Sequence, residues 1–173
     1  NFKVVYNIDL TLMSIAIIFP LVFTIRGAFR RREKALEHLS RFKASLKTVE
    51  SFFLSSKLSD ELKNDCKKSL QELNDALFLH LKTKNEDTSD YDLKIQAISN
   101  FISTNSELIG RGTREKIFRF FRDVMDSADN LIAIHSHRTP VSLKAYCLIF
   151  IYIFPAVYTP TIINKIGFDN PSW

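Results

Sequence analysis

The side chains able to bind a metal or to act as nucleophiles are few and scattered along this sequence. Of its four histidines, His135 and His137 are two residues apart, a spacing that does not place two imidazoles on one face of a helix. Cys66 and Cys147 are far apart in the chain and neither forms a CxxC motif, so both are expected to be reduced packing residues. We expect no metal centre from these residues.

Acidic side chains are the other candidate metal ligands. One group lies in a polar segment and consists of Glu86, Asp87, Asp90 and Asp92. This segment resembles a calcium-binding loop only loosely, because it lacks the turn glycine, and a solvated loop is the simpler interpretation. A second group recurs every third residue and consists of Asp123, Asp126 and Asp129. These aspartates either pair with the basic collar that follows the first apolar run, at Arg26 and residues 30–32, or face water, and the solvated interpretation is favoured because exposed ion pairs contribute little.

Catalysis has no visible basis in the sequence. No set of Ser, His and Asp, and no pair of Cys and His, is spaced to suggest an activated nucleophile. The 173 residues include only four glycines, none of them in a P-loop or a dinucleotide fingerprint. We therefore expect a protein that is not an enzyme and that uses no cofactor. So few glycines also argue against the many tight turns of a β-barrel and favour an all-α fold.

The composition is that of a folded protein in which apolar residues gather near the ends of the chain. The hydrophobic fraction is 46% and the net charge is +5, which excludes a disordered tail and a small disulfide-stapled scaffold. Residues 10–25 are 16 consecutive residues without a charge, and residues 145–163 are 19. At about 1.5 Å per residue the second run covers about 28 Å, close to the roughly 30 Å core of a bilayer.

These two runs predict an α-helical membrane protein, with one transmembrane helix over residues 1–25 and another over residues 145–163. The alternative is a pair of core helices in a soluble bundle, although a buried soluble helix seldom needs apolar residues on every face. The basic residues support the membrane interpretation. A basic collar follows the first run and consists of Arg26, Arg30, Arg31 and Arg32, while Arg138 and Lys144 precede the second run.

Positive charge at both inner borders places residues 26–144 on the inner side of the membrane and residues 164–173 outside as a tail. The sequence does not distinguish a plasma membrane from an organelle membrane. The collar is explained by topology and by anionic headgroups of the lipid bilayer, so we expect no nucleic-acid partner.

The inner segment is expected to form about four amphipathic helices. A first stripe of apolar residues runs from Leu36 to Phe53 at spacings of three and four, and Ser59 is typical of the N-cap of a second helix. A third helix is expected to begin near Ser89 and to end at Gly110 and Gly112, and a fourth to begin at Thr113 as its N-cap. Thr139 and Pro140 are expected to start the second membrane helix. The long stripes predict packing against other copies or subunits.

The run FPLVFTIRGAFRRREKAL, followed later by RTPVSLKAYCLIFIYIFPAVYTP, resembles the membrane segments of the bestrophin and bestrophin-like anion-channel family. The resemblance implies an oligomeric, chloride-type anion channel, pentameric in the family, with a helical inner domain between its second and third spans. It also makes Phe19, Pro20 and Phe23 the candidate pore neck, just outside the basic collar. A narrow apolar ring of this kind can gate by dewetting.

The chain departs from that family at two places. Arg31, Arg32 and Glu33 stand where the family has paired Trp, and Gly27 replaces an aromatic residue one turn after Phe23. These departures keep a second interpretation open, a non-conducting structural subunit of a larger membrane complex with a channel-like fold, since fold does not fix function. Without the resemblance, Phe19 and Phe23 would be expected to face lipid or neighbouring helices.

Overall fold

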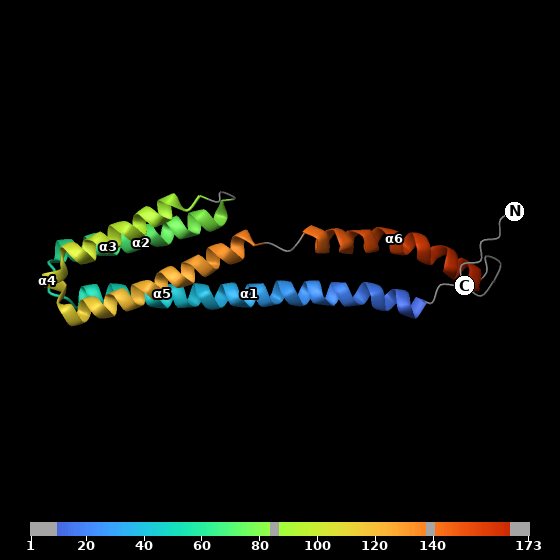
Figure 1. Cartoon of the computed structure of the whole chain (residues 1–173), viewed down its shortest axis with the longest axis horizontal. Coiled ribbons are helices and arrows are strands. Elements are labelled where there is room, and N and C mark those ends of the chain that lie inside the picture. The colour runs from blue at the N-terminus through green and yellow to red at the C-terminus, as the bar shows by residue number, and fades with distance from the viewer. Residues whose placement is uncertain (1–9, 84–86, 138–140, 167–173) are drawn as a thin grey trace. The chain divides into compact units, whose positions relative to one another are not determined.

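The computed structural model describes residues 10–83, 87–137 and 141–166, and these residues are helical almost throughout, with no strand among them (Figure 1). The helices are α1 (Leu10–Leu54), α2 (Asp60–Lys82), α3 (Ser89–Thr104), α4 (Ser106–Ile109), α5 (Arg111–Ser136) and α6 (Val141–Ile166). The all-α prediction is therefore confirmed. Thr139 and Pro140, expected to begin the last helix, lie outside the described residues, as does Glu86.

The chain divides into two compact units. The first, which we call the terminal unit, contains the part of α1 up to Arg31 together with α6. The second, which we call the central unit, lies within Arg32–Arg138 and contains the rest of α1 and the helices α2 to α5. The 45-residue helix α1 thus supplies residues to both units and continues through Pro20.

Both charge-free runs of the sequence lie within helices of the terminal unit, the first in α1 and the second in α6. Over the described residues, however, none of the helices combines the length and the apolar character needed to cross a membrane. The two runs are confirmed as helical, and membrane insertion stays a prediction.

The central unit is built around one hydrophobic core. Helices α2 and α3 lie side by side, and α5 packs on α2 and α4 (Figure 1). Two ring contacts tie α1 to its neighbours, Phe52 to Phe120 of α5 and Phe53 to Phe101 of α3, each with ring centroids 5.8 Å apart. Fully buried apolar residues come from all four long helices of the unit, with Phe42 and Val49 at 0% exposure in α1.

The predicted apolar stripes form this core. The α5 stripe of Ile117, Phe121, Val124 and Ala128 is buried, as are Cys66, Leu70, Leu73 and Leu77 of the α2 stripe. Burial raises the pKa of the Cys66 thiol to about 12, with a smaller contribution from the charge of Glu50. The stripe of α1 begins later than expected, because Leu36 is 56% exposed and the burial starts beyond it.

The helix ends confirm two predicted starts and correct one start and one end, because α3 ends at Thr104 and the short α4 lies between it and Gly110. Ser59 caps α2, its hydroxyl accepting a hydrogen bond from the Leu62 amide at 3.4 Å, and α3 begins at Ser89. The predicted cap at Thr113 is wrong. Gly110 has a φ of +78°, which a residue without a Cβ adopts at little cost, and it ends α4 and starts α5, so Gly112 and Thr113 lie inside α5.

Candidate functional site

The candidate pore-neck and collar residues all lie on α1. Phe19 and Phe23 are 59% and 60% exposed, and their ring centroids are 5.8 Å apart. Positions 19, 23, 26 and 30 are separated by four, three and four residues, so they share one face of the helix. Arg26 and Arg30 are exposed on this face. The phenylalanine pair and two of the arginines therefore form a single stripe, which we call the Phe–Arg stripe.

Pro20 does not belong to this stripe. With Thr24 it lies on another face of α1, which packs against α6 in the terminal unit. The Thr24 hydroxyl donates to the Pro20 carbonyl at 2.6 Å and lies 3.8 Å from the Cys147 sulfur of α6. Arg31, half-buried, is on the same face as Pro20 and Thr24, whereas Arg32 is exposed and falls on a further face. The collar predicted as one group is thus distributed around the helix.

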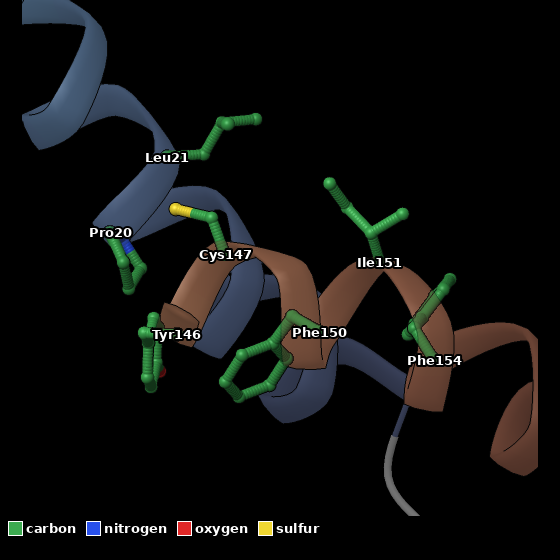
Figure 2. Close-up of a pocket in the computed structure, with 7 residues that line it drawn as sticks. All are labelled: Pro20, Leu21, Tyr146, Cys147, Phe150, Ile151 and Phe154. Atoms are coloured by element: carbon green, nitrogen blue, oxygen red, sulfur yellow. The ribbon is translucent and has the colours of Figure 1, made fainter. Parts of the chain in front are cut away.

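An apolar pocket of about 290 Å³ lies between α1 and α6 in the terminal unit. Its lining residues are Pro20, Leu21, Tyr146, Cys147, Phe150, Ile151 and Phe154. Figure 2 shows the Cys147 sulfur pointing toward α1. Nothing in the sequence predicted this pocket, because the periodicity of a helix that is apolar on every side does not indicate which face meets a neighbour.

Gly27 lies on α1 where the family resemblance leads one to expect an aromatic residue. A Cβ added at Gly27 would meet no atom within 4 Å, so nothing in the described chain requires glycine there.

The aspartate row on α5 has two different environments, neither of which was considered from the sequence. Asp123 and Asp126 pair with Arg41 of α1 at 3.2 and 3.9 Å, a basic residue outside the predicted collar. Asp129 lies near other acidic groups instead. Partial desolvation raises its pKa, and the charges of Asp92 and Asp126 raise it further. The buried Tyr91 hydroxyl, whose pKa is raised by burial and by the charges of Asp129 and Asp92, has no hydrogen-bond partner in the part of the chain that the structure describes.

We expect the substitution Asp129→Asn to stabilise the central unit at pH 7. A carboxyl whose pKa is raised by folding binds its proton more tightly in the folded state, so its charged form at pH 7 opposes folding. The gain should disappear below the ordinary pKa of 3.8, where Asp129 is protonated in both states. Thermal unfolding, monitored by circular dichroism at pH 7 and at pH 3, measures the gain in stability and its disappearance.

Glu72→Gln is the control with the opposite sign. The Lys94 ammonium donates a hydrogen bond to Glu72 at 2.8 Å and lowers the pKa of that carboxyl. Its charged form therefore favours folding, and its removal should lower the melting temperature slightly at pH 7 and not at pH 3. A destabilising effect of Asp129→Asn at pH 7 would contradict the electrostatic assignment.

The described acidic residues near the start of α3 take part in local hydrogen bonds. Among the described residues, no three His, Cys, Asp or Glu side chains are placed to hold a metal ion together. Asp87 accepts from the Ser89 amide at 2.9 Å, so it serves as a local turn residue before α3. His80 of α2 places its Nδ1 3.1 Å from the Asp87 carbonyl oxygen, which ties the same segment to α2.

Comparison with known proteins gives no relative from which to transfer a function. No family model, no curated protein and no solved structure matches this chain. The functional argument therefore depends on the chain's own residues and on the family resemblance of its two apolar runs.

Proposed function

We propose that this chain is a subunit of an oligomeric, bestrophin-like anion channel in which α1 lines the pore. The observation that carries the proposal is the Phe–Arg stripe. Phe19, Phe23, Arg26 and Arg30 share one exposed face of α1, and that face is distinct from the one that packs on α6. A stripe left open by its own chain can be covered by symmetry-related copies around an axis.

The chemistry of the stripe suits anion permeation. An apolar ring of Phe19 and Phe23 offers an ion nothing to replace its lost hydration, so it forms a barrier that gates by dewetting. The Arg26 and Arg30 guanidiniums follow on the same face and raise the local concentration of anions next to that barrier. The two groups together attract anions and restrict their passage.

The membrane position of the terminal unit is part of the proposal. What supports it is the exposure of large apolar side chains on both of its helices. On α1 these include Ile15, Ile18, Val22, Ile25 and Phe29, each between 48% and 58% exposed. On α6 they include Ile149, Ile151, Tyr152 and Ile153, between 52% and 75%. So large an exposed apolar surface is typical of contact with lipid or with other subunits.

A second candidate is a non-conducting structural subunit of a larger membrane complex. The observation that favours it is Gly27, which stands where the family resemblance implies a further aromatic ring, and at which an added Cβ would meet open space. In that case the terminal unit would anchor the complex, and the stripe would contact another subunit.

The charge of the stripe provides the test. In planar bilayers with a salt gradient, the purified chain should conduct anions, and Arg30→Gln should lower the anion-to-cation permeability ratio severalfold. Arg32→Gln is the matched control. It removes the same charge from an exposed position two residues away, on a different face of α1, and should leave the ratio close to that of the wild type. Equal effects of the two variants would contradict a pore-lining role for the stripe.

A further inference from the structure

The apolar pocket of the terminal unit lies on the face of α1 that the proposed pore does not use. Its walls are almost entirely carbon, from Pro20 and Leu21 on one side and from Phe150, Ile151 and Phe154 on the other. Its volume of about 290 Å³ is at the lower end of the range for ligand pockets, roughly 300 to 1,000 Å³. A slender apolar group fits such a space better than a bulky one.

A basic residue follows on α1 beyond one end of the pocket. Thr24 lies beside Cys147, while the lining residues come before Thr24 on α1 and mostly after Cys147 on α6, so the two helices run antiparallel there. Continuing past Thr24, Arg31 is on the same face of α1. Arg31 therefore belongs to the end of the groove that lies toward Thr24, and the other end, at Phe154, is apolar.

An apolar groove with a positive charge beyond one end is complementary to an anionic amphiphile. We propose that the pocket between α1 and α6 binds one acyl chain of an anionic phospholipid, with the phosphate at the end of the groove marked by Arg31. The inference rests on the membrane position of α1 and α6 in the proposed function, since an acyl chain is supplied there by the bilayer. It extends that function by giving the α6-facing side of α1 a lipid ligand.

The proposal is tested on the full chain purified in detergent and mixed with phosphatidylglycerol or phosphatidylcholine of identical acyl chains. Native mass spectrometry should show phosphatidylglycerol retained severalfold more than phosphatidylcholine. Arg31→Gln should remove most of this preference, whereas Arg26→Gln, which loses the same charge on another face of α1, should keep it. Equal retention of the two lipids by the unmodified chain would overturn the proposal, and this comparison requires no variant.

Substitutions that fill the pocket provide a second test of the proposal. Cys147→Phe places a ring in the groove and should release most of the bound phosphatidylglycerol. Leu148→Phe is the matched control, because Leu148 is 44% exposed and does not line the pocket. Ile151→Phe narrows the same pocket from another position and serves if Cys147→Phe does not fold, as judged by circular dichroism. Full retention in folded pocket-filling variants would also overturn the proposal.

The two proposals fail in different measurements. Lipid retention is read as a mass and channel activity as a current. A protein that binds phosphatidylglycerol without conducting would contradict the proposed channel and leave the lipid site in place. A protein that conducts but does not distinguish the two lipids would contradict the lipid site and leave the proposed channel in place.

Discussion

Replacing Phe42 by Ala is expected to lower the free energy of unfolding of the central unit by about 3 to 5 kcal/mol, the cost typical of removing a buried aromatic ring. Phe42 is 0% exposed and belongs to the cluster of buried residues contributed by α1, α2, α3 and α5. The loss combines the transfer of the ring out of an apolar surrounding with the cavity that it leaves. For a domain of ordinary stability this is a large part of the total.

The measurement is denaturant unfolding of the full chain, with the transition of the central unit identified by hydrogen exchange of the amides of α2, α3 and α5. Phe118→Ala is the control of the same residue type. Its ring is 41% exposed, so less area returns to water and the loss should be much smaller. Equal losses for the two variants would show that Phe42 does not occupy the core described here.

Replacing Phe23 by Ala is expected to raise the anion current severalfold in planar bilayers. Phe23 is the member of the aromatic pair nearer to Arg26, it is 60% exposed in the single chain, and its ring contacts that of Phe19 at 5.8 Å between centroids. Removing the ring widens and wets the proposed constriction, so an entering anion keeps more of its hydration. Because every subunit of the oligomer would carry the substitution, the whole constriction would change, and a large effect on the current is expected.

Phe29→Ala is the control for this substitution. Phe29 is 58% exposed, almost as much as Phe23, but its position on α1 is off the Phe–Arg stripe. Its removal should leave the current near the wild-type value. A homo-oligomer that carries no current with either Phe or Ala at position 23 would exclude the channel and favour the structural subunit.

The helices and most of their buried faces could be predicted because these features follow from local periodicity. The spacing of Ile117, Phe121 and Val124 determines which side of α5 is buried, whichever helix covers it. Ser59 is likewise a local signal, since its hydroxyl caps the amide of a residue three positions on. The start of α5 was missed because two glycines lie close together and only one of them, Gly110, has the positive φ that ends a helix.

The contacts of the candidate site could not be predicted in the same way. Whether Pro20 faces α6 or a pore depends on which side of an all-apolar helix meets its neighbour, and a uniform apolar surface contains no such information. The partner of Asp123 was missed for a related reason. Arg41 is 82 positions away in sequence, and only the packing of α1 on α5 brings the two side chains together.

The burial of Cys66 has a further consequence for the kinetics of the molecule. A thiol reacts through its thiolate, and a thiol that is 2% exposed with a pKa of about 12 supplies almost none while the central unit is closed. Alkylation of Cys66 therefore requires a transient opening of that unit, whereas Cys147 in the terminal unit is half-exposed. When both cysteines are alkylated in a single time course, the first label is expected on Cys147 and the second on Cys66. The rate at which the second label is added therefore measures how often the central unit opens and exposes its core.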